Sequence, residues 1–203
     1  MTLPKCFLDL ASLYEENGFS LYLIGGTSRD ILLGLPCRDY DFVTDATPKE
    51  EKAFLLQADY TFAKFGSVKV TFEDVKIDVT TLRKEEGYED YRHPRKIVFV
   101  RDLQEDSLRR DFTVNAIYID RNGNVIDFHN GMEDLQKKVL RFIGDPWKRI
   151  EEDPLRIIRG ERFAKTLGFA FDLDTAKAME ELSPLLEKLN PEKVNMERRK
   201  MLK

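Results

Sequence analysis

Residues 20–45, with the sequence SLYLIGGTSRDILLGLPCRDYDFVTD, combine the local signals of an α/β fold. The apolar run at 20–24 is typical of a buried strand, and Gly25 and Gly26 indicate a turn directly after it. Residues 27–34 have helical periodicity, and the end of the stretch alternates as a second strand does. A strand, a glycine turn and a helix in succession place backbone N–H groups near the strand end, which makes a natural anion site.

Asp39 and Asp41 are the sharpest feature of this stretch. Alternate residues of a strand face the same side, so the two carboxylates lie together, and a divalent cation would relieve their repulsion. An isolated D-x-D is also typical of a solvated edge strand. Here the large apolar Tyr40 and Phe42 predict a buried opposite face. Asp78 is a candidate third carboxylate from a neighbouring strand, although any hairpin strand can display an acid.

The glycine turn is a candidate phosphate site. Gly25 and Gly26 let the backbone approach a phosphate closely, and Arg29 follows where it can add a charge-assisted contact. A plain tight turn would have the same sequence. Neither G-x-G-x-x-G nor G-x-x-x-x-G-K-[ST] is present, which argues against dinucleotide-binding and P-loop sites.

The segment 109–116, RRDFTVNA, places arginines, an acid and an amide close together. Arg110, Asp111 and Asn115 suit a triphosphate and a ribose, because guanidinium groups bind phosphate oxygens and polar groups bind hydroxyls. A structural alternative is a simple ion pair between Arg109 and Asp111.

The segment 151–163, EEDPLRIIRGERF, has its charged residues three positions apart. Helical spacing would put Asp153 beside Arg156 and would align Arg156 with Arg159 and Arg162. A carboxylate that accepts from an exocyclic amine, next to a guanidinium that donates to a ring nitrogen, matches the Watson–Crick edges of cytosine and adenine. Uracil and guanine would leave a group unpaired, at about 1–3 kcal/mol. A ladder of surface ion pairs would produce the same spacing.

Composition and charge separate the chain into two parts. We expect α/β structure over residues 1–136 and a helical domain over 137–203. The first part carries 17 Lys and Arg against 25 Asp and Glu, a net charge of −8, and the second carries 16 against 12, a net charge of +4. The acidic part is therefore suited to cations and the basic part to phosphates.

The periodicity predicts a series of further elements along the chain. The expected strands are 20–26, 39–45, 67–74, 75–82, 96–100 and 116–120. The expected helices are 5–17, 27–34, 47–57, 133–143, 153–168, 172–189 and 191–203.

Whole-chain properties exclude several classes of protein. With 203 residues, 14 Phe and 7 Tyr, the chain has enough apolar surface for a folded core, which argues against disorder. No apolar run is long enough for a membrane span, and acids at 9, 15 and 16 argue against a signal peptide. Two cysteines cannot form a disulfide framework, so we expect reduced thiols and a cytoplasmic protein that meets no membrane.

Five motifs occur in the order of one known family: LIGGTSRDILLG, RDYDF, VKIDVTTLR, RRDFTVNA and EDPLRIIRGERFA. In this order they resemble the class II tRNA nucleotidyltransferases, the CCA-adding enzymes, with which bacterial poly(A) polymerases share a head domain. The resemblance implies an α/β (α+β) head, with a mixed sheet flanked by helices, followed by an all-helical neck. It implies metal-dependent transfer of C and A nucleotides from CTP and ATP to the 3′ end of tRNA, with release of pyrophosphate.

The resemblance also implies residue roles. Asp39 and Asp41 would hold two magnesium ions, Gly26 and Arg29 would contact the triphosphate, and Arg110 would serve its sugar-proximal portion. In the neck, base recognition would fall to Asp153 and Arg156, with Arg159 and Arg162 beside the nucleotide.

Two questions remain open within the family. Residues 85–100, EEGYEDYRHPRKIVFV, resemble the flexible loop of members that add the final A, while an enzyme that adds only A and a poly(A) polymerase are alternatives. The family continues into body and tail domains, so we expect these domains either to be missing from the chain or to come from a partner chain. A catalytically silent nucleotide- or RNA-binding fragment is the alternative from another class.

Overall fold

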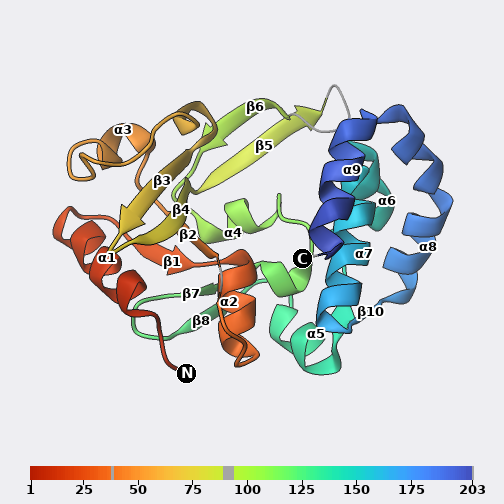
Figure 1. The fold of residues 1–203 in the computed structure, drawn as a ribbon, viewed down its shortest axis with the longest axis horizontal. Coiled ribbons are helices and arrows are strands. Elements are labelled where there is room, and N and C mark those ends of the chain that lie inside the picture. Colours follow the sequence, from red (N-terminus) through yellow and green to blue (C-terminus); the bar gives the residue numbers. More distant parts are fainter. Residues whose placement is uncertain (38, 89–93, 203) are drawn as a thin grey trace. The chain divides into compact units, whose positions relative to one another are not determined.

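Alternating apolar residues of the first half build a six-stranded mixed sheet (Figure 1). The computed structural model describes residues 1–37, 39–88 and 94–202. The strand order is β3-β4-β2-β1-β7-β8, and only β2 and β4 run parallel. The strands are β1 (Leu21–Leu23), β2 (Tyr40–Thr44), β3 (Ser67–Phe72), β4 (Val75–Thr81), β7 (Ile117–Ile119) and β8 (Val125–Asp127).

Both faces of this sheet are covered, because neighbouring residues of β2 point into different cores. Phe42 packs with Phe7 and Tyr14 of α1 (Lys5–Glu16), whereas Val43 packs with Tyr118 and with Leu103 of α4 (Leu103–Ser107). Phe42 and Val43 are both about 1% exposed. The expected burial of the apolar side of β2 is thus confirmed, and so is the expected mixed sheet.

The expected hairpin between β3 and β4 is also present. Its turn is formed by Glu73 and Asp74, with φ of 46° and 64°. Two successive left-handed residues are the geometry of the hairpin turn that matches the twist of paired strands.

Other elements differ from their expected lengths. The helix expected over 47–57 is only the single turn α3 (Pro48–Glu51). A capping box between Thr47 and Glu50 stabilises its N-terminus. After α3 the backbone continues in turns whose hydrogen bonds mostly join residues three apart, and a 3₁₀ turn η1 (Ala63–Phe65) precedes β3. Among the described residues, the elements without an expected counterpart include α4, β8 and β5 (Arg83–Tyr88). The strand β6 (Pro94–Phe99) corresponds to the expected strand at 96–100, and it pairs with β5.

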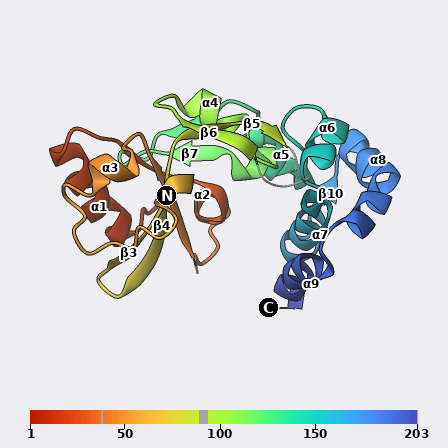
Figure 2. The same cartoon turned by 90° about the horizontal axis from the view of Figure 1, so that it is seen from above.

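The last third of the chain is mainly helical, as expected. Its four main helices, α6 (Pro146–Glu152), α7 (Leu155–Leu167), α8 (Leu173–Glu181) and α9 (Pro191–Arg199), lie side by side in both views (Figures 1 and 2). The helix expected at 133–143 is the shorter α5 (Gly131–Lys137), followed by β9 (Val139–Leu140). Because β9 pairs with β10 (Ala170–Phe171), this part is not wholly helical. The 3₁₀ turns are η2 (Thr113–Asn115), η3 (Ser183–Lys188) and η4 (Lys200–Leu202).

The chain divides into two compact units, and their boundaries differ from the expected division at 136/137. Unit 1 comprises 1–84, 97–109 and 115–128, and unit 2 comprises 85–96, 110–114 and 129–203. The expected boundary falls within α5. The motif RRDFTVNA is split, because its central residues join unit 2 while both of its ends belong to unit 1. Within the part of the chain that the structure describes, no helix is long and apolar enough to cross a membrane.

Candidate functional site

Three acidic residues lie near the start of β2 or on the neighbouring strand β4. Asp41 is directly paired with Asp78 in the parallel register of β2 and β4. Paired residues of neighbouring strands project to the same face. Asp39 lies in the bend before β2 and is exposed, while Asp41 and Asp78 are half-buried. Unit 1 therefore presents the expected carboxylates in order, with Asp39 outermost.

The glycine turn lies against the second of these carboxylates. Gly25 has a φ of +67°, and a Cβ built there would lie 3.5 Å from Oδ2 of Asp41. The N–H of Ile24 donates to the backbone oxygen of Asp41 at 3.2 Å. Directly after this contact the helix α2 (Gly25–Leu32) begins. The first N–H groups of a helix have no partner within the helix, so this turn brings N–H donors to the edge that carries the carboxylates.

Thr27 is a residue of this site that the sequence did not indicate. Its hydroxyl donates to the backbone oxygen of Asp39 at 3.1 Å and accepts from the N–H of Asp41 at 2.8 Å. Thr27 is 1% exposed. One buried hydroxyl therefore joins α2 to the backbone between the two acids, on either side of Tyr40. Hydrogen bonds to the main chain leave no trace in the spacing of charged residues, which explains why the pattern did not reveal it.

Asp78 is held by a cation of the neighbouring strand. Nζ of Lys69 lies 3.0 Å from Oδ1 of Asp78, and the two residues are paired across β3 and β4. Among the residues that the structure describes, no three His, Cys, Asp or Glu side chains gather closely enough to form a metal site by themselves. Asp39 and Asp41 are nevertheless a suitable donor set for magnesium, which commonly takes one or two carboxylates, water and substrate phosphates. The role of Asp78 as a third catalytic carboxylate stays a prediction.

Arg29 and Asn115 are brought together, although they are far apart in the sequence. The Nη1 of Arg29 donates to Oδ1 of Asn115 at 2.8 Å, and its Nε and Nη2 donate to Oδ1 of Asp30 at 2.9 and 2.7 Å. Arg29 is 7% and Asn115 6% exposed. These bonds fix the guanidinium beside the glycine turn, where a Cβ on Gly26 would lie 3.6 Å from Nη2. The expected phosphate contact of Arg29 stays a prediction.

In unit 2, Asp111 is paired with Arg159. Its Oδ2 accepts from Nε and Nη2 of Arg159 at 3.0 and 2.5 Å, and its Oδ1 accepts from the N–H of Phe112 at 2.7 Å. Burial alone would raise the pKa of Asp111, but Arg159 and these hydrogen bonds lower it to about 2. Arg109 pairs with Asp106 at 2.9 Å within unit 1. The alternative pair between Arg109 and Asp111 stays a prediction.

The spacing predicted that Asp153 and Arg156 share one face of a helix. In the structure the two residues do not belong to one continuous helix. Asp153 is the residue that ends α6, and Pro154 precedes α7. The Oδ1 of Asp153 accepts from the N–H of Leu155 at 3.1 Å. The physical reason is Pro154, because the residue before a proline is driven out of helical geometry.

Arg156 is instead held by the end of α6. Its Nη1 donates to Oε2 of Glu152 at 2.8 Å and to the backbone oxygen of Arg149 at 2.5 Å. The same Oε2 accepts from Nη1 of Arg149 at 2.5 Å. Arg156 is 6% exposed, and its Nε and Nη2 make no hydrogen bond with the described residues. The guanidinium is thus fixed at one nitrogen and keeps donors for a ligand.

Arg162 also has an acidic partner. Its Nε lies 3.3 Å from Oε1 of Glu197 on α9, and Nζ of Lys200 lies 2.8 Å from Oε2 of the same carboxylate. Burial would raise the pKa of Glu197, but Lys200 and the neighbouring arginines lower it. Each of Arg156, Arg159 and Arg162 therefore pairs with an acid. A series of ion pairs, as in the structural alternative, is present, and in each pair one partner is buried while the other reaches solvent.

The short segment 110–114 is fixed inside unit 2 by both stacking and polar contacts. The rings of Phe112 and Phe142 stack at 4.5 Å. A Cβ on Gly160 of α7 would lie 3.1 Å from Cζ of Phe112, so any larger residue there would crowd the ring. The backbone oxygen of Arg110 accepts from Nη2 of Arg149 at 2.7 Å. The place of Arg110 in the sugar-proximal part of a triphosphate site stays a prediction.

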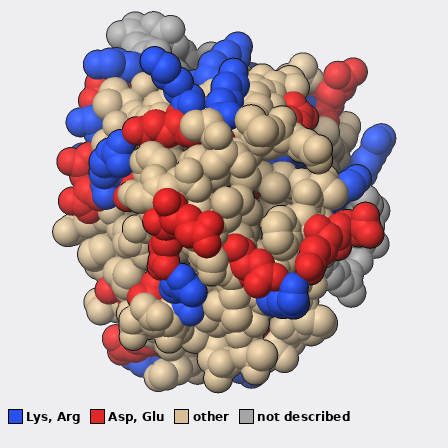
Figure 3. Space-filling view, turned by 90° about the vertical axis from the view of Figure 1, so that its left-hand side faces the viewer, with Lys and Arg blue, Asp and Glu red and all other residues tan. Residues whose placement is uncertain are grey.

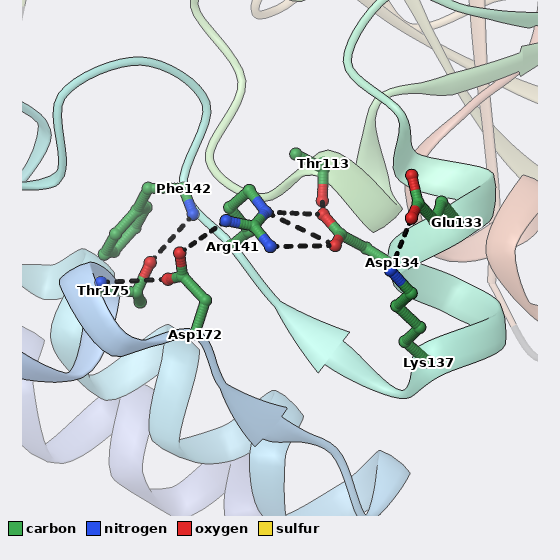
Figure 4. Close-up of polar contacts among 8 residues, drawn as sticks. All are labelled: Thr113, Glu133, Asp134, Lys137, Arg141, Phe142, Asp172 and Thr175. Atoms are coloured by element: carbon green, nitrogen blue, oxygen red, sulfur yellow. Dashed lines mark hydrogen bonds and ion pairs between the residues drawn. The ribbon is translucent and has the colours of Figure 1, made fainter.

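Figure 4 shows the polar contacts that complete this fixation. Arg141 lies between two carboxylates, 3.1 Å from Asp134 of α5 and 2.8 Å from Asp172, which caps α8. The hydroxyl of Thr113 donates to Asp134 at 2.7 Å, and that of Thr175 accepts from the N–H of Phe142 at 3.2 Å. The helices α5 and α8 are thereby joined to each other through Arg141 and, through Thr113, to the segment that contains Asp111.

Comparison with known proteins identifies the family. The family model described as poly A polymerase head domain matches residues 21–141. A protein of Enterococcus faecalis named CCA-adding enzyme is 42% identical over 204 residues, covering 99% of this chain and 50% of that protein. The chain therefore spans about half the length of the curated relatives it matches.

Solved structures give the same result. The CCA-adding enzyme of Bacillus stearothermophilus in complex with CTP is 35% identical, with a TM-score of 0.89, covering 98% of this chain and 49% of that one. A tRNA nucleotidyltransferase complexed with a primer tRNA and an incoming ATP analog is 32% identical, with a TM-score of 0.71, covering 87% of this chain and 50% of that one.

Proposed function

The chain belongs to the family of the poly A polymerase head domain, and from this premise we propose that it adds C and A nucleotides from CTP and ATP to the 3′ end of tRNA. The observation that carries the proposal is the carboxylate edge of unit 1, where Asp41 lies against Gly25 at the start of α2. The similarity to a CTP-bound enzyme over 98% of the chain supports the choice of nucleotide.

Asp39 and Asp41 would hold the metal that the reaction requires. Two magnesium ions held there would lower the pKa of the primer 3′-hydroxyl and balance the charge on the attacking and leaving oxygens. The contribution of the protein is to keep the two carboxylates in position, which the hydroxyl of Thr27 does through their backbone.

The glycine turn would receive the triphosphate. Gly25 and Gly26 leave room for a phosphate close to the backbone, and the first N–H groups of α2 point to that space. Arg29, fixed by Asp30 and Asn115, adds positive charge beside the turn. Arg110 is proposed to serve the part of the triphosphate nearer the sugar.

Base selection is proposed for Asp153 and Arg156. The donors left on Arg156 would bond the ring nitrogen of cytosine or adenine, and Asp153 would accept from the exocyclic amine. UTP and GTP would leave a buried group unpaired, at about 1–3 kcal/mol. Arg159 and Arg162 are proposed to help bind the nucleotide, with their guanidinium groups oriented by Asp111 and Glu197.

The proposal places the protein in the cytoplasm. Its two cysteines, Cys6 and Cys37, are free thiols, which suits a reducing compartment.

The decisive experiment supplies the chain with magnesium, with tRNA that lacks its 3′ end, and with each labelled nucleotide in turn. We expect incorporation of C from CTP alone, addition of A only after C, and no reaction with UTP or GTP. Long products from ATP alone would favour the poly(A) polymerase. Nucleotide binding without incorporation would identify the chain as a silent binding module and contradict the proposal.

A further inference from the structure

A cavity of about 450 Å³ opens on unit 1, between α3, η1 and the end of β6. Three lysines line it, Lys49, Lys52 and Lys64, together with the ring of Phe99. The remaining lining comes from the first residues of α3 and from Ala63. All of these residues belong to unit 1.

The cavity is locally basic although unit 1 as a whole is rich in acids. The three lysines are exposed, and none of them forms an ion pair with the residues that the structure describes. The acids of α3 are engaged elsewhere, since Glu50 pairs with Arg101 at 2.8 Å and Glu51 is buried against Tyr14. Figure 3 shows the same contrast on this side of the molecule, with basic side chains along the upper rim and a band of acidic side chains across the middle.

Aromatic rings are exposed at the same place. Phe99 is 36% exposed, and Phe62 and Phe65, on either side of Ala63 and Lys64, are 49% and 40% exposed. Only one other phenylalanine among the described residues, Phe128, is comparably exposed. Exposed apolar rings gathered in one place mark a binding surface more often than they serve the fold.

The ring of Phe99 is also held in position. Gly66 has a φ of +80°, and a Cβ built on it would lie 2.8 Å from Cε1 of Phe99. The ring therefore rests directly on the backbone of Gly66. Lys64 is similarly ordered, because its Nζ lies 4.7 Å from the centroid of Phe65.

We propose that this cavity binds single-stranded RNA, with phosphates on the lysines and a base stacked on Phe99. Single-strand binding surfaces combine cations that follow the backbone with aromatic rings that take the bases. The volume suits one nucleotide, since small-ligand sites measure roughly 300–1,000 Å³. An acidic peptide would satisfy the lysines but would leave the exposed rings without a partner.

The RNA site is separate from the carboxylate edge. Asp39 and Asp41 stand at the start of β2, whereas the cavity begins with Thr47, three residues after β2 ends. None of the residues proposed for nucleotidyl transfer lines it. The inference therefore goes beyond the proposed function and does not depend on it.

The first test measures binding of a fluorescein-labelled single-stranded oligo(U) 12-mer to the intact chain by anisotropy, over a series of KCl concentrations. The variant K49Q/K52Q/K64Q should bind at least 10-fold more weakly at low salt. Its slope of log affinity against log salt should fall by about 2, because each phosphate contact on a single strand contributes about 0.7. The matched control K76Q/K148Q/K177Q removes three exposed lysines that lie outside the cavity and, like the cavity lysines, form no ion pair with the described residues, and it should keep both values.

The second test separates stacking from charge. Phe99→Leu keeps an apolar side chain but loses the ring face, and it should weaken binding about 5-fold or more, whereas Phe99→Tyr should bind as the parent does. Thermal unfolding of both variants checks that they fold. Equal affinities of the leucine and tyrosine variants, equal losses in the two lysine triples, or tighter binding of poly(Glu) than of oligo(U) would each overturn the inference.

Discussion

Unit 1 and unit 2 position their candidate site residues by different means. In unit 1 the acids are fixed through the backbone, by the hydroxyl of Thr27 and the turn at Gly25. In unit 2 the arginines are fixed by carboxylates, as Arg159 is by Asp111. The backbone contact itself uses no carboxylate oxygen of Asp39 or Asp41, whereas the arginines of unit 2 are held through the same guanidinium groups that the proposed recognition would use.

The candidate site residues of the two units also differ in how deeply their side chains are buried. Asp39 is exposed, but Asp111 and Arg156 are 8% and 6% exposed. Removing an exposed acid costs little folding free energy, while removing one partner of a buried ion pair leaves a charge without compensation. We therefore expect substitutions at the carboxylate edge to affect activity alone, and those in the arginine ladder to affect stability as well.

The largest effect is expected at the carboxylate edge. Asp41→Asn should lower nucleotide incorporation by about 10³-fold or more, because a metal ligand of the proposed transfer is lost while the shape is kept. Thermal unfolding should be nearly unchanged. The matched control is Asp74→Asn in the β3–β4 turn, where φ is 64° and Asn is well tolerated. If Asp41→Asn incorporated nucleotides as Asp74→Asn does, the site would be wrongly assigned.

The next largest effect is expected in unit 2. Asp111→Ala should lower the free energy of unfolding by about 3–4 kcal/mol at pH 7, because it leaves the partly buried Arg159 without its partner. The double variant D111A/R159M should recover part of the loss. Urea unfolding of the four proteins of this cycle measures the coupling.

The pH dependence of this pair has a definite sign. The pKa of Asp111 is lowered to about 2, so its contribution is present above pH 4 and is lost as the pH falls through about 2. The stability difference between the parent and Asp111→Ala should therefore shrink in acid. A difference that stayed constant from pH 7 to pH 2 would show that Asp111 stabilises by packing rather than by charge.

Glu51 is a buried acid of unit 1 that forms no ion pair with the described residues, so its charge state can be tested. This carboxyl is fully buried, accepts from the hydroxyl of Tyr14 at 2.5 Å, and has no hydrogen-bond partner for its Oε2 among the described residues. Burial raises its pKa to about 7, against 4.5 in the unfolded chain. The stabilisation is complete below pH 4.5 and is lost as the pH rises through 7.

Glu51→Gln should remove the loss of stability that the parent shows as the pH rises through 7. At pH 8 the variant should be about 2–3 kcal/mol more stable than the parent, and at pH 4 the two should be similar. Thermal unfolding at both pH values measures this, with Glu16→Gln as an exposed control. Equal stability of the parent and Glu51→Gln at pH 8 would mean that Glu51 is ionised without cost.

The smallest effect is expected at Thr27. Thr27→Val keeps the shape but leaves the N–H of Asp41 without its acceptor, at about 1–2 kcal/mol. The affinity for Mn²⁺, followed by electron paramagnetic resonance, should fall about 10-fold, and Thr27→Ser should restore it. A fold-only role predicts lower stability of Thr27→Val with unchanged Mn²⁺ affinity.

The sequence predicted the local features of unit 1 well, because they follow from short-range patterns. The alternation through Tyr40 and Phe42 predicted β2, and the turn at Glu73 and Asp74 was placed correctly. The expected helix at 47–57 was wrong beyond its capping box, since a cap determines where a helix starts and not how far it extends.

The ion pairs of unit 2 could not be predicted from the spacing of charged residues alone. Asp111 and Arg159 are 48 positions apart, and no local pattern connects them. Pro154 could have revealed that Asp153 stands outside the helix, because a proline restricts the residue before it. Glu152 was missed as the partner of Arg156, because the two residues are four positions apart but lie on different helices, α6 and α7.

The split of RRDFTVNA between the units has a consequence for synthesis. The polypeptide crosses from one unit to the other five times, after residues 84, 96, 109, 114 and 128. Phe112 leaves the ribosome long before Phe142 and Gly160, against which it packs. A nascent chain that stops near residue 128 therefore carries an aromatic side chain whose pocket does not yet exist. Intermediates with exposed apolar side chains are prone to aggregate. We therefore expect the nascent chain to need chaperones that bind exposed apolar segments until residues 129–203 have been synthesised.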